Sequence, residues 1–239
     1  MADDVTRDLD ARAARAAAPG DAAAGPLAVA ATVVVLRDGP GGPEVLMIER
    51  PDRGSFAGAW VFPGGKVDPG DLGDTAEAVA RAAAVRETRE ETGLLVARED
   101  LVLFALWDPP PDLPLRIRTW FFFVRDPGGA LDLAADEAVA SMWARPAEVL
   151  ERHARGGLTL YPPTWVTLHE IAGQQDVDDV FAVARLGGPR RYETVARTGP
   201  YGQLLLWRED AEYDTAGAGG SARHRLDLSV LPWVYTRAE

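Results

Sequence analysis

Residues 62–94 read FPGGKVDPGDLGDTAEAVARAAAVRETREETGL, a glycine- and proline-rich loop that leads into a helical pattern. The pattern predicts one long helix over about 74–92, and Gly93 is the residue type that commonly ends a helix. Short apolar stretches typical of strands precede and follow this segment. This order predicts a mixed sheet packed between helices.

Three glutamates near the end of the predicted helix share one face. Glu87, Glu90 and Glu91 are three and four residues apart, which places their side chains side by side on a helix. Like charges at this spacing repel, whereas a hard divalent cation such as Mg²⁺ or Mn²⁺ prefers carboxylate oxygens. The alternative is a solvated helix face on which Arg86 and Arg89 form ion pairs with the glutamates.

The loop before the helix favours the metal site over the solvated face. Gly64 and Gly65 allow the backbone to approach a neighbouring group closely. Lys66 follows them directly and is the only lysine in the chain. A lysine that contacts a phosphate, placed next to a helix that binds a metal ion, is a chemically coherent arrangement.

The segment resembles the signature of the Nudix hydrolase family, which is Gly, five residues, Glu, seven residues, then Arg-Glu-apolar-any-Glu-Glu-any-Gly-apolar. The matching residues are Gly65, Arg86, Glu87, Glu90, Glu91, Gly93 and Leu94. Two positions depart from the signature, because Asp71 replaces its first Glu and Thr88 stands at an apolar site. In addition, fourteen residues rather than seven separate Asp71 from Arg86.

The seven additional residues admit two interpretations. Seven residues advance a helix by about two turns, so a helical insertion would leave the glutamates on nearly the same face. Alternatively, the insertion forms a longer loop over the site. An enlarged signature of this kind resembles the branch of the family that includes coenzyme A diphosphatases.

The resemblance implies roles for individual residues. Glu87, Glu90, Glu91 and the Gly64 carbonyl would hold Mg²⁺ or Mn²⁺, and Arg86 would orient the glutamates. A water molecule activated by the metal ion would then attack a phosphorus atom. The residues expected to act as catalytic groups are Glu90, Glu91, Arg86 and Glu137, and those expected to contact substrate are Lys66, Gly65, Arg50, Arg116 and Arg118.

Several of these assignments compete with simpler ones. Asp136 and Glu137 are candidates for the general base, but they also suit an acidic surface loop. Arg116 and Arg118 point to the same side of a predicted strand, where they either clamp a terminal phosphate or face solvent. His224 either contacts substrate or lies on the surface.

The resemblance implies an α/β (α+β) fold, a Nudix-type α/β/α sandwich with a mixed β-sheet. We expect residues 1–26 to form a flexible N-terminal tail, because they are rich in Ala, Asp and Arg without an apolar stripe. Residues 27–239 would form a single domain, with 190–239 as an added C-terminal β-rich segment. The expected strands cover 27–36, 44–50, 101–108 and 116–124, and helices are expected from Pro146 and near 163–174 and 176–186.

Composition excludes several classes of function. The net charge of −12 argues against a surface that tracks nucleic-acid phosphates. The absence of cysteine excludes disulfides and thiolate chemistry, and three scattered histidines do not make a zinc site. No apolar run approaches the length that spans a membrane, and the N-terminus lacks a secretory pattern, so we expect a cytoplasmic protein.

The predicted activity is metal-dependent hydrolysis of a phosphoanhydride bond in a nucleoside diphosphate linked to another moiety, with coenzyme A or acyl-coenzyme A as the expected substrate. ADP-ribose or dinucleotide hydrolysis is an alternative on the same scaffold. A catalytically silent domain that senses a nucleotide is a third hypothesis, which the presence of all three glutamates disfavours. Because dimers are common in this family, a homodimer is also an expectation.

Overall fold

The computed structural model describes residues 27–53, 56–113, 116–215 and 219–238. The predicted N-terminal tail, residues 1–26, lies outside this part of the chain. No helix in the described ranges is long and apolar enough to cross a membrane.

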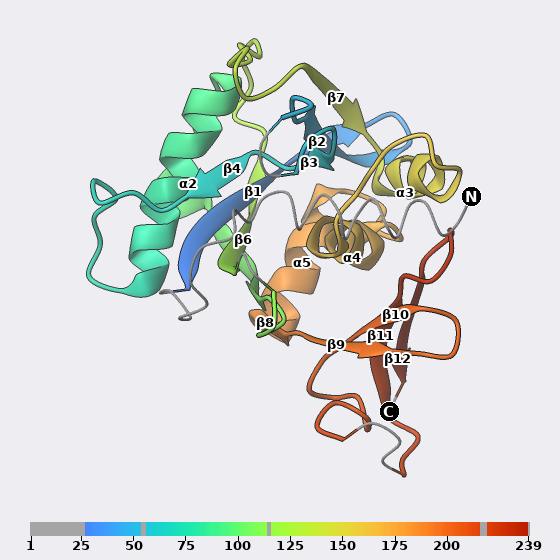
Figure 1. Cartoon of the computed structure of the whole chain (residues 1–239). Coiled ribbons are helices and arrows are strands. Elements are labelled where there is room, and N and C mark those ends of the chain that lie inside the picture. Colours follow the sequence, from blue (N-terminus) through green and yellow to red (C-terminus); the bar gives the residue numbers. More distant parts are fainter. Residues whose placement is uncertain (1–26, 54–55, 114–115, 216–218, 239) are drawn as a thin grey trace.

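A mixed eight-stranded sheet forms the centre of the molecule (Figure 1). Its main strand order is β3-β2-β1-β6-β5-β8, with β4 paired to β1 and β7 paired to β2. The β1·β6 and β5·β8 pairs are parallel, and the other pairs are antiparallel. The strands are β1 (Ala28–Gly39), β2 (Gly42–Glu49), β3 (Trp60–Val61), β4 (Gly64–Lys66), β5 (Val102–Asp108), β6 (Ile117–Arg125), β7 (Ala140–Ala144) and β8 (Arg190–Glu193).

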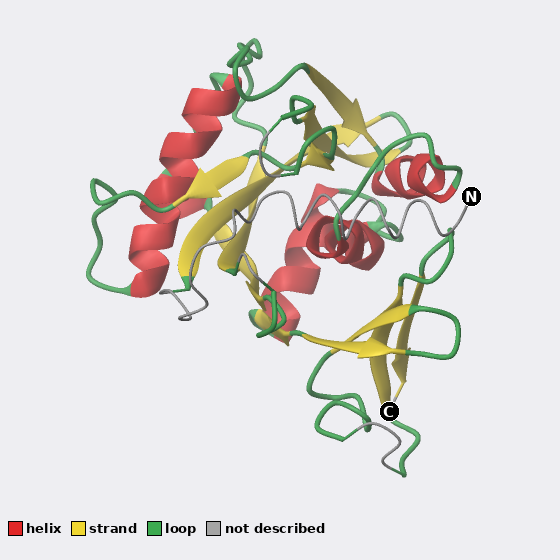
Figure 2. Cartoon of the chain, in the orientation of Figure 1, coloured by secondary structure: helices red, strands yellow, loops and turns green. Residues whose placement is uncertain are grey.

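Helices cover both faces of this sheet, which confirms the predicted α/β/α arrangement (Figure 2). One face packs against α2 (Ala76–Thr92), whose inward side chains are the small Ala80, Ala83 and Ala84. The opposite face packs against α4 (Pro162–Ile171) and α5 (Val177–Gly187), with α3 (Pro146–Ala154) beside α4. Alternation along β6 sends Phe122 to the first face and Phe121 and Phe123 to the second.

The ends of α2 follow from their sequence. The Thr75 side chain accepts a hydrogen bond from the Ala78 N–H at 3.1 Å and caps the first turn. Gly93 adopts the left-handed conformation (φ 74°) and donates its N–H to the Arg89 carbonyl. Because the helix begins at Ala76, the fourteen residues between Asp71 and Arg86 are divided between a short loop, 72–75, and the first part of α2, 76–85.

The C-terminal strands differ in part from the prediction. Only β8 joins the large sheet, whereas β9 (Val195–Thr198), β10 (Gln203–Leu206), β11 (Arg223–Asp227) and β12 (Val234–Ala238) form a separate antiparallel sheet. The two sheets share a core, in which Trp107 of β5 stacks on Tyr192 at 3.9 Å between ring centroids and Trp207 meets both rings edge-on. Burying these large aromatic surfaces fixes the small sheet against the main body.

Candidate active site

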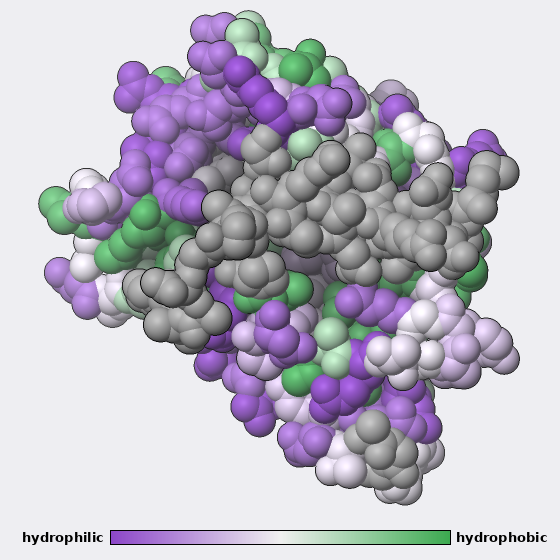
Figure 3. Space-filling view, in the orientation of Figure 1, coloured by the Kyte–Doolittle hydropathy of each residue, from purple (hydrophilic) through white to green (hydrophobic). Residues whose placement is uncertain are grey.

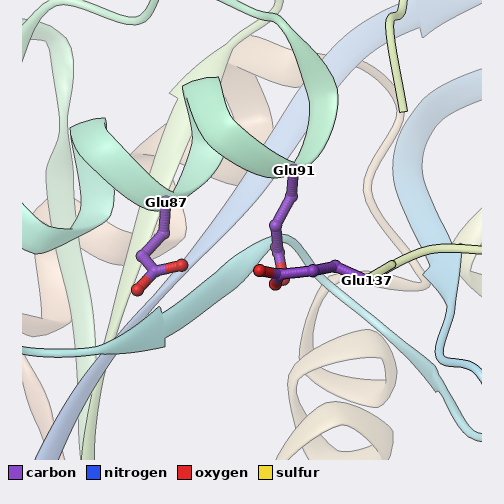
Figure 4. A group of neighbouring side chains, drawn as sticks. All are labelled: Glu87, Glu91 and Glu137. Atoms are coloured by element: carbon purple, nitrogen blue, oxygen red, sulfur yellow. The ribbon is translucent and has the colours of Figure 1, made fainter. Parts of the chain in front are cut away.

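Three carboxylates from two separate elements converge beside α2. Glu87 and Glu91 lie on the helix, and Glu137 comes from the loop before β7. One oxygen of each carboxylate lies within 4.8 Å of the others. Figure 4 shows the two helical side chains pointing toward β4 while Glu137 reaches in from another direction. The surface over the upper part of α2 is mainly hydrophilic (Figure 3).

Glu91 is the most deeply buried of the three, with a side chain that is 1% exposed. It accepts a hydrogen bond from the Gly64 N–H at 2.7 Å and one from Arg50 at 2.9 Å. Burial, together with the nearby Glu137, raises the pKa of Glu91 to about 8, although the Gly64 and Arg50 donors act in the opposite direction. Burial also raises the pKa of Glu87. The hydrogen-bond donors of the site therefore offset only part of the free-energy cost of ionising Glu91 and Glu87.

The two glycines of β4 let the backbone pass directly beneath the helix. A Cβ atom on Gly65 would lie 2.3 Å from the Glu87 carboxyl carbon, and one on Gly64 would lie 2.2 Å from the Ala31 carbonyl oxygen. Gly64 also has a φ of 149°. Any side chain at these positions would collide with the site or with β1, which explains the pair of glycines in the sequence.

Arg86 connects the loop before α2 to the glutamates. Its guanidinium forms two hydrogen bonds with Asp71, at 3.0 and 2.8 Å, and contacts Glu87 at 2.8 Å and Glu90 at 3.0 Å. It also donates to the Lys66 carbonyl oxygen at 3.0 Å. These bonds hold the pKa of the Asp71 carboxyl below its usual value. The Arg86 guanidinium therefore contacts both Asp71 and Glu87, and the orientation of Glu87 stays its predicted role.

The loop that carries Glu137 is docked on the end of α2. Its Asp132 and Ala134 N–H groups donate to the carbonyls of Thr92 and Glu91, at 2.9 and 3.2 Å. Arg50 lies 3.6 Å from Glu137, and Arg53 lies 3.1 Å from Asp136. The structure therefore places Glu137 at the carboxylate cluster and Asp136 at the surface, where its side chain is 96% exposed.

Other predicted site residues lie apart from the cluster. The Glu90 carboxylate is 55% exposed, bonds to Arg86 and falls outside the group formed by Glu87, Glu91 and Glu137. Lys66 is exposed on β4. Arg118 donates to Asp108 at 2.5 Å, and the Nε of Arg116 is buried without a hydrogen-bond partner in the described residues.

His224 corrects the prediction of a surface histidine. It is 3% exposed and lies between the two sheets, where its ring nitrogens contact Glu209 at 2.7 Å and the Tyr235 hydroxyl at 2.8 Å. Its ring also meets Tyr192 of β8 at 5.8 Å between centroids, so His224 belongs to the core that the two sheets share. The sequence prediction failed because a histidine in a short polar run, ARHRL, carries no local signal of burial.

The carboxylate cluster has the chemistry of a divalent-cation site. Three carboxyl groups from α2 and the loop before β7 face one another, and burial and the neighbouring carboxylates disfavour the ionised forms of Glu91 and Glu87. A hard cation such as Mg²⁺ or Mn²⁺ favours oxygen ligands and would relieve both effects. Glu87, Glu91 and Glu137 therefore fit such an ion.

Comparison with known proteins shows the family to which the chain belongs. The model of the NUDIX domain family matches residues 26–162, which is more than half of the chain. The chain is 31% identical over 118 residues to a CTP pyrophosphohydrolase of Escherichia coli, covering 49% of this chain and 76% of that protein. It is 27% identical over 173 residues to the putative nudix hydrolase 7 of Caenorhabditis elegans, covering 56% of this chain and 57% of that protein.

The solved structures give the same fold. A NUDIX hydrolase from Alicyclobacillus acidocaldarius superposes with a TM-score of 0.61 at 24% sequence identity, covering 67% of this chain and 97% of that one. The chain therefore belongs to the Nudix family and is a Nudix hydrolase, an enzyme of the class that acts on nucleoside diphosphate derivatives.

Proposed function

We propose that the protein hydrolyses a phosphoanhydride bond in a nucleoside diphosphate linked to another moiety, with Mg²⁺ or Mn²⁺ at the carboxylate cluster. The convergence of Glu87, Glu91 and Glu137 within 4.8 Å supports this proposal most directly. Glu87, Glu91, Glu137 and the Gly64 carbonyl would hold the ion. Glu90, which lies beside Arg86, would be a metal ligand at a second position. When bound, the ion supplies charge neutralisation for the diphosphate and acidifies a coordinated water.

The residues around the cluster suit distinct tasks. Glu91 is buried and held by two donors, which suits a fixed ligand. Glu137 is 46% exposed and belongs to a different element, so it can reach solvent and accept the proton of the attacking water. Gly65 and Arg50 border the cluster, Lys66 is exposed next to Gly65 on β4, and all three would contact substrate phosphates. Within the pair predicted as a clamp, Arg118 donates through its Nε to Asp108, and the buried Nε of Arg116 has no partner among the described residues.

The proposed substrate is coenzyme A or an acyl-coenzyme A. Its support is the enlarged signature, which has seven additional residues between Asp71 and Arg86, in a stretch of which residues 76–85 belong to α2. A second candidate is CTP, because a relative with 31% identity is a CTP pyrophosphohydrolase. ADP-ribose and a dinucleotide are tested beside these two candidates, because the same scaffold could hydrolyse them.

The test uses purified full chain with Mg²⁺ or Mn²⁺ and separates the products by chromatography. Coenzyme A, acetyl-coenzyme A, CTP, ADP-ribose and NADH are offered in parallel at the same concentration. Glu91→Gln serves as the active-site variant, and Glu99→Gln, an exposed glutamate on the short helix η1 (Arg98–Asp100), serves as the matched control.

We expect cleavage of coenzyme A at the diphosphate, a loss of at least about 100-fold in Glu91→Gln and no loss in Glu99→Gln. A tenfold preference for CTP would replace coenzyme A by the second candidate and leave the chemistry intact. If no substrate is cleaved and Glu91→Gln binds nucleotide as well as the wild type does, the protein is a silent sensor.

A further inference from the structure

The strand β12 lies at one edge of the small sheet, whose order is β12-β11-β10-β9. It pairs with β11 through five consecutive residue pairs without a register shift. In the described ranges, its other edge has no strand partner and no backbone hydrogen bond to another segment. An open edge of this kind is a template for another strand.

A hollow lies on each side of this edge. On the face toward the main body, a hollow of about 410 Å³ is lined by Trp165 and His169 of α4 and by Trp233 and Tyr235. On the opposite face, a hollow of about 320 Å³ is lined by Leu204, Arg225, Val234 and Thr236. The side chains of a strand alternate between two faces, so a strand added to β12 would place successive side chains toward the first hollow and beside Val234 and Thr236 at the border of the second. This combination is typical of recognition by β-strand addition.

The edge lacks the features that usually prevent such pairing. Natural edge strands carry lysines, prolines or bulges, whereas Val234–Ala238 reads VYTRA, with Arg237 as its only charge. Val234 is 57% exposed, and Val230, in the turn before it, is also 57% exposed. Apolar side chains are thus left in solvent beside unpaired backbone groups.

We propose that the occupant of this edge is the β12 strand of a second copy of the chain, paired antiparallel about a two-fold axis at Thr236. Thr236 is the midpoint of the five-residue strand, so this register pairs every residue. It sets Thr236 against Thr236 and Val234 against Ala238. It also sets Arg237 against Tyr235, so no like charges lie opposite each other.

Charge in the surroundings agrees with this register. Glu170 of α4 lies beneath Tyr235, whose hydroxyl donates to it at 3.2 Å. Arg237 lies 3.7 Å from the same carboxylate within its own chain. In the paired arrangement the Arg237 of each copy faces the Tyr235 and Glu170 of the other, which places a cation beside an aromatic ring and a carboxylate. The same surface patch serves both copies, as two-fold symmetry requires.

The N-terminal segment of the chain is a poorer occupant. Ten of its 26 residues are Ala and five are Asp, both of which are depleted in strands. The β12 sequence is instead rich in β-branched and aromatic residues, which strands prefer. The composition of the two segments therefore favours a second β12.

The experiment measures the mass of the full-length chain in solution by sedimentation and light scattering, over concentrations from about 1 to 500 µM, the range in which a small interface dissociates. Thr236→Lys and Thr236→Glu each place like charges across the two-fold axis. Thr198→Lys places the same charge on β9, the other edge of the same sheet, and is the matched control. The double variant Val234→Lys/Ala238→Lys, at two exposed positions that face each other across the axis, repeats the test if the Thr236 variants do not fold.

We expect the wild type and Thr198→Lys to reach twice the chain mass of 25.7 kDa with rising concentration. Thr236→Lys and Thr236→Glu should each remain monomeric, and an equimolar mixture of the two should recover the dimer. A wild type that stays monomeric at every concentration overturns the proposal. So does a dimer that persists equally in Thr236→Lys, Thr236→Glu and Val234→Lys/Ala238→Lys, since it would use another surface.

Discussion

Arg86 and Asp71 form a bidentate ion pair, with hydrogen bonds of 3.0 and 2.8 Å, across the insertion that separates them in the sequence. The Asp71 side chain is 4% exposed, and its partner also bonds to Glu87 and Glu90. The Asp71–Arg86 pair therefore connects the loop to α2 despite the seven additional residues between them. The shorter aspartate still reaches the arginine that orients the glutamates.

Replacing Asp71 by Asn should weaken the orientation of the glutamates by Arg86 without abolishing metal binding at the carboxylate cluster. We expect a loss of about tenfold in kcat, because Arg86 keeps Glu87 but loses its anchor. The free energy of unfolding should fall by about 1–3 kcal/mol, because a partly buried charge-assisted pair is broken. Asp68→Asn is the control, since Asp68 lies 3.8 Å from Arg86 and is 66% exposed. Equal losses in both variants would contradict a specific role for Asp71.

Adding one methyl group at Gly65 should disable the carboxylate cluster. In Gly65→Ala the new Cβ would lie 2.3 Å from the Glu87 carboxyl carbon, so Glu87 must move. We expect activity to fall by about 100-fold and the rise in Tm on adding Mg²⁺ to shrink. Gly70→Ala introduces the same methyl group in the same loop, where nothing lies within 4 Å, and should match the wild type. Unchanged activity in Gly65→Ala would show that Glu87 is not needed at its present position.

Glu137→Gln separates two possible roles of this side chain. If Glu137 accepts the proton of the attacking water, kcat should fall by about 100-fold while the Mg²⁺ dissociation constant changes by no more than a few fold. Asp136→Asn, at the exposed neighbour, should leave both quantities unchanged. A large loss of Mg²⁺ affinity that added metal ion fully compensates would assign Glu137 as a ligand alone.

Thr88→Val should stabilise the protein. Thr88 is fully buried on α2, and its hydroxyl has no hydrogen-bond partner in the described part of the chain. Valine has nearly the same shape without the polar group, so the free energy of unfolding should rise by about 1 kcal/mol. The position is one that the family signature fills with an apolar residue. Thermal denaturation checks the prediction, and a lower Tm would indicate an unseen partner of the hydroxyl.

His153 should make stability depend on pH in the acid range. It is 4% exposed and packs against Trp233, and burial lowers its pKa to about 4. Between pH 6.5 and about 4 the unfolded chain binds a proton that the folded protein does not. Stability should therefore fall as the pH falls through this window, by up to about 1.4 kcal/mol per pH unit.

Urea denaturation at pH 7.5 and pH 4.5 measures this dependence, and His153→Leu provides the comparison. The variant should lose less stability than the wild type over the same interval. Parallel losses in the two proteins would assign the acid sensitivity to other groups.

The sequence alone determined the part of the site that lies on one continuous segment. Glu87, Glu91, Arg86 and the two glycines fall within residues 62–94, where helix periodicity and glycine geometry act over short distances. The same local patterns predicted most strands and helices, because alternation and helix-ending residues are visible in neighbouring positions. The family followed from the same segment.

Only the tertiary structure decided which distant group joins the carboxylate cluster and which predicted residues lie outside it. Glu137 joins the cluster because its loop hydrogen-bonds to the end of α2, whereas Glu90 turns to Arg86 and Arg118 to Asp108. The separate small sheet and the burial of His224 likewise depend on contacts between residues far apart in the chain. Backbone preferences and periodicity act between neighbours, but burial and pairing of a charged side chain depend on what the folded chain brings beside it.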